Sequence, residues 1–133
     1  MKKTNLLLMF ALFVFISKSE AQDFREMKVF PSVDSLRKVI GQKTKMYVGI
    51  FDTKYDSKSN LTYLNVGDNY PLQVLTLIIK GDDRKKFSSP PEIFYKNKEI
   101  KVIGIPELVN DKLQVVIHDP SQLIGIIKVI TNK

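Results

Sequence analysis

The sequence contains no cysteine and a single histidine, His118. Without cysteine the chain cannot form disulfides, and one imidazole cannot supply the usual ligand set of a zinc site. Catalysis by a cysteine nucleophile is excluded, and a Ser-His-Asp triad would need His118 next to a serine in a cleft. His118 instead stands at a predicted strand end, before Asp119 and Pro120. The sequence therefore predicts no catalytic, metal or cofactor site and a fold that depends on its apolar core.

The acidic residues leave one enzymatic alternative, a carboxylate-based nuclease. Asp82, Asp83 and Arg84 follow the third predicted strand. Phosphodiester cleavage needs a metal-binding carboxylate pair and a cationic clamp on the phosphate. Arginine is scarce, since the only others are Arg25 and Arg37. The same segment also fits a turn followed by a helical turn, and we expect that the protein is not an enzyme.

No apolar run is long enough to cross a membrane. Residues 6–16 form an unbroken apolar run of eleven residues, whereas a spanning helix needs about 20. Lys2 and Lys3 precede this run and Ser19-Glu20-Ala21 follows it, which is the order of a secretory signal. The sequence therefore predicts a signal peptide at 1–21, cleaved after Ala21, and a protein exported to the periplasm or the extracellular space.

Basic residues outnumber acidic ones, 21 to 14, for a net charge of +7. The surplus persists when residues 1–21 are removed. It is compatible with binding to a polyanion, but it is also ordinary for a soluble protein. Charge by itself therefore assigns no function.

Beyond residue 43 the apolar side chains recur with a period of two, which is typical of β-strands. The predicted strands are 44–51, 61–66, 73–80, 99–105 and 113–118. A short helix is expected at 33–40 and a polar loop at 53–60, while the tail at 124–130 either adds a strand or packs as a cap. This count and order favour a five-stranded Greek-key barrel over a β-sandwich, which usually has about seven strands. The predicted domain spans 32–133, after an irregular arm at 22–31.

Alternation and β-branching also predict the core. The apolar side chains on the inward faces of these strands should be largely buried. They are Val48, Ile50, Leu64, Val66, Leu75, Leu77, Val102, Ile103, Val115 and Ile117.

Six short segments carry a more specific signal. They are Tyr63-Leu64-Asn65-Val66-Gly67, Tyr70-Pro71, Asp83-Arg84 with Phe87, Pro90-Pro91 with Tyr95, Lys98-Glu99-Ile100-Lys101-Val102-Ile103-Gly104, and Asp119-Pro120-Ser121-Gln122. In this order, between Gly41 and Gln122, they resemble a bacterial family of small OB-fold domains of the nucleic-acid-binding type. The resemblance implies a mostly β OB-fold barrel with a short N-terminal helix, here as an exported, stand-alone domain.

Two segments depart from the pattern of that family. Lys96-Asn97-Lys98 replaces a Lys-Gly-Lys-like turn, and asparagine tolerates the left-handed backbone that glycine would adopt there. Val109-Asn110-Asp111-Lys112 stands where an aromatic residue and a glycine are usual. The second change falls in the loop between strands four and five, a common ligand contact of OB folds. The resemblance therefore leaves inherited binding open.

Nucleic-acid binding requires aromatic platforms on the face of the central strands, surrounded by cations. Aromatic and polar side chains of the first two strands, together with nearby lysines and one arginine, meet this description. The candidate ligand-binding residues are Lys45, Tyr47, Phe51, Lys54, Tyr55, Lys58, Tyr63, Asn65, Lys80, Arg84 and Lys85. They predict binding of single-stranded DNA or RNA, or of another oligomeric anion, without sequence specificity.

The alternative is a non-enzymatic scaffold or binding module for a protein, a glycan or a small molecule. Aspartates lie among the candidate lysines and reduce the local positive charge. Phe51 and Tyr63 could equally pack within a small barrel. The aspartates are Asp52, Asp56, Asp68, Asp82 and Asp83. The two hypotheses differ in whether the lysines gather on one face around Tyr63.

Overall fold

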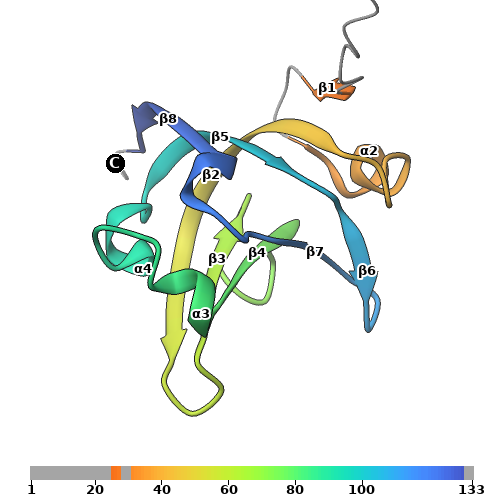
Figure 1. The fold of residues 1–133 in the computed structure, drawn as a ribbon. Coiled ribbons are helices and arrows are strands. Elements are labelled where there is room, and N and C mark those ends of the chain that lie inside the picture. Colours follow the sequence, from red (N-terminus) through yellow and green to blue (C-terminus); the bar gives the residue numbers. More distant parts are fainter. Residues whose placement is uncertain (1–24, 28–30, 131–133) are drawn as a thin grey trace, which may run out of the picture.

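A computed structural model describes residues 25–27 and 31–130, and the predicted signal peptide lies outside the described residues. The domain is mostly β, as the sequence predicted (Figure 1). Its strands are β1 (Arg25–Met27), β2 (Thr44–Asp56), β3 (Leu61–Val66), β4 (Leu75–Lys80), β5 (Lys98–Gly104), β6 (Glu107–Val109), β7 (Lys112–Val116) and β8 (Leu123–Val129). Its helices are α2 (Val33–Arg37), α3 (Gly81–Arg84), α4 (Pro91–Phe94) and the 3-10 helix η2 (Pro120–Gln122).

The strands form one sheet in the order β6-β7-β4-β3-β2-β5-β8, with β1 added in parallel to β2. Within it, β5-β2-β3-β4 has the spatial order of a Greek key, in which a fourth strand returns beside the first. Strand β7 then pairs in parallel with β4. The chain therefore winds its central strands as a Greek key, and adds further strands at both sides.

The prediction of a closed five-stranded barrel was wrong in two respects. Among the described residues the sheet has eight strands, and its hydrogen-bonded order is open, with β6 and β8 at its ends. Pro106 lies between β5 and β6 and has no N–H to donate, so the fourth predicted strand ends there and the short β6 pairs with β7 instead. The apolar tail supplies the eighth strand by pairing with β5.

The short helix α2 begins where the sequence predicted it. Ser32 and Ser35 form a capping box, in which each side chain accepts from the other residue's backbone N–H. Leu36 is completely buried, which attaches the helix to the core. The helix ends at Arg37, earlier than predicted, and Gly41 adopts a left-handed φ of +80° soon after it.

The core prediction is confirmed at nine of its ten positions. These nine side chains are at most 1% exposed, namely Val48, Ile50, Leu64, Val66, Leu75, Leu77, Val102, Val115 and Ile117. Ile103 is only partly buried. It pairs with Lys45, whereas its neighbour Val102 pairs with the buried Met46, so Ile103 lies on the outer face of the sheet.

A β-bulge in β2 decides which side chains share a face. The strand continues to Asp56, although the sequence predicted a loop from residue 53. Its register with β3 shifts between Ile50 and Asp52, so that one extra residue is inserted. Beyond the bulge Thr53 is paired with the buried Leu64. Odd-numbered residues of β2 therefore face outward before the bulge and inward after it.

The connection from β4 to β5 holds α3 and α4, which lie together near one end of the sheet (Figure 1). Phe87 packs against the core cluster, and its ring meets Tyr95 edge-on with centroids 6.1 Å apart. No helix in the described part of the chain is long and apolar enough to span a membrane.

Candidate nucleic-acid interface

A groove of about 630 Å³ lies on the outer face of β2, β3 and β4. The second half of β2 supplies one wall and the β6–β7 hairpin supplies the other. The hairpin turns at Asn110 and Asp111, whose φ values of 50° and 59° fit a type I′ turn, so the loop expected between the fourth and fifth predicted strands is a tight turn. The groove thus uses a strand face and a loop that OB folds employ for oligonucleotides and oligosaccharides.

The floor of the groove is a chain of polar side chains. Asp52 Oδ2 accepts from Asn65 Nδ2 at 3.4 Å and from the Tyr70 backbone N–H at 3.3 Å. Asn65 Oδ1 accepts from Thr76 Oγ1 at 3.0 Å, and Gln73 Nε2 donates to the same hydroxyl at 3.4 Å. Asn65 is only 4% exposed. This network fixes the floor and ties the loop that carries Tyr70 to β2.

Two pairs, each of one tyrosine and one lysine, line the groove. Lys54 lies directly opposite Tyr63 in the β2–β3 ladder, and both line the groove. Across the groove, Lys112 Nζ lies 5.5 Å from the centre of the Tyr70 ring. Tyr70 is 62% exposed, so much of its ring is open to solvent. The second pair places a cation beside an aromatic ring, and the first places a lysine and a tyrosine as cross-strand neighbours on one face.

The charges that line the groove cancel. Lys54 and Lys112 are balanced by Asp52 and Asp56. A hydrogen bond from the Lys58 backbone N–H holds the pKa of Asp56 below its usual value, with further help from Ser59. Asp56 therefore stays ionised at neutral pH, and the groove is not a strongly cationic channel.

Three of the predicted ligand-binding residues line this groove: Lys54, Tyr63 and Asn65. Since Asn65 is buried and both ends of its amide are bonded, its part is to hold the floor. Lys54 and Tyr63 also line the groove, where a ligand can reach them.

The bulge separates the predicted residues of the first strand from the groove. Lys45 and Tyr47 lie before it, opposite Ile103 and Lys101 of β5. The Lys101 ammonium lies 5.3 Å from the centre of the Tyr47 ring. Phe51 lies at the register shift itself. None of these three predicted residues lines the groove.

Tyr55 and Arg84 belong to a different cluster. The Arg84 guanidinium lies 4.0 Å above the Tyr55 ring, and Arg84 Nη2 bonds to Glu92 Oε1 at 2.7 Å. The Tyr55 hydroxyl donates to Asn60 Oδ1 at 2.9 Å. Arg84 thus joins α3, α4 and the end of β2, and its charge is already neutralised by Glu92.

The remaining predicted lysines, Lys58, Lys80 and Lys85, are exposed and lie outside the groove. Lys85 lies 3.9 Å from Asp82 in an exposed pair. The lysines therefore do not gather around Tyr63, and Lys54 is the only one of the predicted lysines that lines the same groove.

Tyr70 and Lys112 were not among the predicted residues. Each lies in a segment that the sequence singled out for another reason, Tyr70 with Pro71 in the resemblance and Lys112 in the departing loop. Neither lies on a predicted strand face, and alternation carries no information about loop side chains. Lys112 could have been found from its position in the loop between the fourth and fifth predicted strands, since that loop commonly contacts ligands in OB folds.

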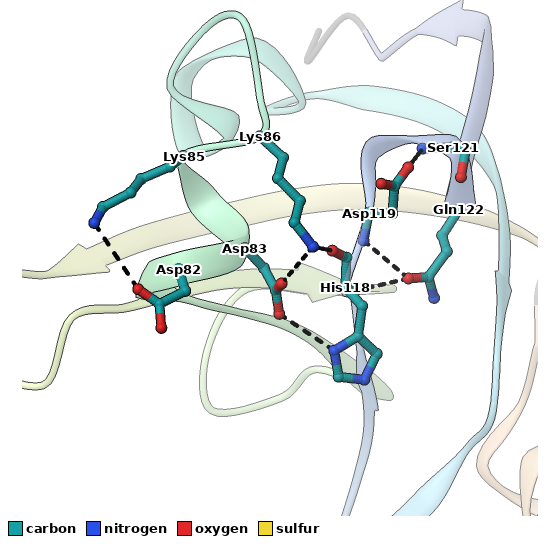
Figure 2. Close-up of polar contacts among 8 residues, drawn as sticks. All are labelled: Asp82, Asp83, Lys85, Lys86, His118, Asp119, Ser121 and Gln122. Carbon is teal, nitrogen blue, oxygen red and sulfur yellow. Dashed lines mark hydrogen bonds and ion pairs between the residues drawn. The ribbon is translucent and has the colours of Figure 1, made fainter.

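Asp82 and Asp83, two of the residues considered for nuclease chemistry, form ion pairs with Lys85 and Lys86 (Figure 2). Asp83 accepts from Lys86 Nζ at 3.0 Å and lies 3.2 Å from His118 Nδ1. Gly81–Arg84 forms the predicted helical turn, α3. The His118 ring points away from Ser121, whose backbone N–H donates to Asp119 (Figure 2). Within residues 25–27 and 31–130, no three His, Asp or Glu side chains are grouped as a metal site.

No protein-family model matches this chain, and no curated protein matches it. Solved structures match it in fold. Asparaginyl-tRNA synthetase from Pyrococcus horikoshii has a TM-score of 0.51 and 11% identity over 79% of this chain. Aspartyl-tRNA synthetase from Entamoeba histolytica has a TM-score of 0.51 and 8% identity over 83% of it. The chain covers only 24% and 26% of those two proteins, about a quarter of their length.

At these identities the similarity concerns the fold. Together with the Greek-key order of β5-β2-β3-β4, it defines an OB-fold-like domain, the class that the sequence resemblance implied. The groove occupies the strand face and the hairpin loop at which this class binds its ligands.

Proposed function

We propose that the groove binds single-stranded nucleic acid without sequence specificity. The observation that carries this proposal is the pairing of Lys54 with Tyr63 and of Lys112 with Tyr70 along the groove. An unpaired base stacks on an aromatic ring with about 1 to 3 kcal/mol, whatever its identity. A lysine beside each ring suits the phosphate that follows a stacked base.

The architecture supports the same ligand. Strands β3 and β4 are the second and third strands of the Greek key, and their outer face forms the groove. OB folds bind oligonucleotides on this face and in the adjoining loops. The similar solved structures are synthetases whose names specify tRNA. In this proposal the protein is a non-enzymatic binding module, exported by its signal peptide.

Fluorescence anisotropy with a labelled ten-nucleotide oligonucleotide tests the proposal. Tyr63→Ala should weaken binding by about 10-fold, since the loss of one stacked base corresponds to about 1.4 kcal/mol. Tyr63→Phe should restore most of it, because the ring that stacks is retained. Tyr47→Phe, outside the groove, serves as a control for changing a tyrosine. If Tyr63→Ala binds the oligonucleotide as tightly as the parent protein, the ring makes no stacking contact, and only the general positive charge of the surface would account for binding.

A neutral oligosaccharide is the second candidate ligand. Two observations favour it: the charges of Asp52, Lys54, Asp56 and Lys112 cancel, and of the predicted lysines only Lys54 lines the groove with Tyr63. A glycan carries no phosphates and needs no cationic channel. OB folds also bind oligosaccharides on this face. Salt distinguishes the two ligands, since affinity for a neutral glycan should not change between 50 and 300 mM NaCl, whereas affinity for an oligonucleotide should fall.

A further inference from the structure

The second half of β2 places two carboxylates in the groove. Asp52 and Asp56 lie on either side of Lys54, and alternate residues of a strand share a face. All three line the groove beside Tyr63. Asp52 accepts both of its hydrogen bonds at Oδ2, while Asp56 accepts from the Lys58 backbone N–H at Oδ1. Asp56 is also hydrogen-bonded by Ser59. Because a carboxylate has about four lone-pair sites, each of the two side chains keeps capacity to accept from a ligand.

The oxygens of a carboxylate accept hydrogen bonds and donate none, and the same is true of the oxygens of a phosphodiester. Asp52 and Asp56 therefore repel the phosphates of a strand in the groove and offset the attraction of Lys54 and Lys112. Gln73, which also lines the groove, has a buried Oε1 without a hydrogen-bond partner. A ligand that suits this surface carries hydroxyl donors between its phosphates.

We infer that the groove selects RNA over DNA, with Asp52 and Asp56 accepting hydrogen bonds from ribose 2′-hydroxyl groups. The 2′-hydroxyl is the donor that RNA has and DNA lacks. An acidic side chain that accepts from a ribose 2′-hydroxyl is an established arrangement in dinucleotide-binding domains. This inference rests on the proposed function and assigns the class of nucleic acid.

The first test compares three ten-nucleotide oligomers that share the uracil base: oligo(U), oligo(dU) and 2′-O-methyl oligo(U). One added hydrogen bond to a charged group corresponds to a factor of about 10 in affinity. Oligo(U) should therefore bind about 10-fold more tightly than oligo(dU). The 2′-O-methyl oligomer should bind no better than oligo(dU), because it keeps the 2′ oxygen and loses the donor.

The second test assigns the preference to a residue. Asp56→Asn removes the negative charge but keeps an oxygen that can accept from the Lys58 backbone N–H. It should strengthen binding of oligo(dU) and reduce the preference for oligo(U) to about threefold or less. Asp34→Asn makes the same change of charge on α2, outside the groove, and should leave the ratio unchanged. Asp52→Asn is the second groove variant, and circular dichroism reports whether it folds.

The outcomes separate this inference from the proposed function. No measurable binding of any of the three oligomers would overturn the proposed function. Equal binding of oligo(U) and oligo(dU) would overturn RNA selectivity while single-stranded nucleic-acid binding stands. A preference for oligo(U) that persists in both Asp56→Asn and Asp52→Asn would overturn the assignment to these carboxylates.

Discussion

Asp83 and His118 are 35 positions apart in the chain, and His118 Nδ1 lies 3.2 Å from Asp83 Oδ2. Lys86 completes the contact, donating to Asp83 Oδ1 at 3.0 Å and to the His118 carbonyl oxygen at 2.9 Å (Figure 2). These bonds join α3, in the connection between β4 and β5, to the turn that follows β7. They therefore tie together two segments that the sheet does not pair.

This cluster predicts an acid-sensitive contribution to stability. The hydrogen bond from Lys86, and after it that from His118, holds the pKa of Asp83 below its usual value. A carboxyl whose pKa is lowered by folding stabilises the protein above its unfolded pKa of about 4. That contribution is lost as the pH falls through the lower, folded value. Asp83→Asn should therefore lower the free energy of unfolding at pH 7 and flatten its decline below about pH 4.

Urea unfolding at pH 7, 4 and 3 measures this effect. Asp82→Asn is the matched control. The Asp82 side chain is fully exposed, and its ion pair with Lys85, at 3.9 Å, is exposed too and should contribute little to stability. The control should leave the pH dependence as it is in the parent protein. Parallel pH profiles for the parent and Asp83→Asn would contradict the prediction.

Arg84 should contribute to stability and not to binding. Its guanidinium stacks on Tyr55 and bonds to Glu92, and the two charged side chains are only 26% and 16% exposed. Arg84→Met should cost about 1 to 3 kcal/mol, because it leaves a largely buried carboxylate unpaired. Arg84→Met combined with Glu92→Gln should recover part of that loss. Urea melts measure both variants.

Oligonucleotide titrations complete the test of Arg84. Arg84→Met should bind as the parent protein does, since Arg84 does not line the groove. A loss of affinity in a folded Arg84→Met variant would show that Arg84 contributes to binding.

Salt dependence distinguishes the lysines of the groove from the others. Lys54→Ala and Lys112→Ala should each reduce the slope of log affinity against log salt by about 0.7, the value for one phosphate contact on a single strand. Lys85→Ala removes a lysine outside the groove and should leave the slope unchanged. Anisotropy titrations between 50 and 300 mM NaCl give the slopes. A uniform effect of all three variants would indicate binding by general charge.

The core should be sensitive at Ile50, just before the bulge. Its side chain is completely buried, and Ile50→Ala should cost about 2 to 5 kcal/mol in urea melts. Ile93→Ala is the control, since Ile93 is 72% exposed and its truncation should change stability by less than about 0.5 kcal/mol. Similar losses in both variants would mean that the inward face of β2 is misassigned.

Export and processing are tested by mass. Since Lys2 and Lys3, the apolar run and Ser19-Glu20-Ala21 follow the order of a signal peptide, the exported protein should begin at Gln22. Intact-mass spectrometry of secreted or periplasmic material decides this. A mass that includes Met1 to Ala21 would contradict cleavage.

The amino-acid sequence by itself determined where most strands lie and which side chains form the core. Alternation is a local property, and strands β3 and β4 end just before Gly67 and Gly81, two glycines that also interrupt the apolar pattern of the sequence. Nine of ten predicted core residues are therefore buried, and the tail at 124–130, which could have been a cap, contributes β8. The exception, Ile103, follows the buried Val102 and so falls on the other face of β5.

The tertiary structure decided which polar and aromatic side chains share a surface. One extra residue between Ile50 and Asp52 reverses the faces of β2, so that Lys54 joins Tyr63 while Tyr55 turns to Arg84. A bulge is defined by the register with the partner strand, which no local pattern contains. The groove likewise depends on Tyr70 and Lys112, which come together only when two loops distant in the chain fold against each other.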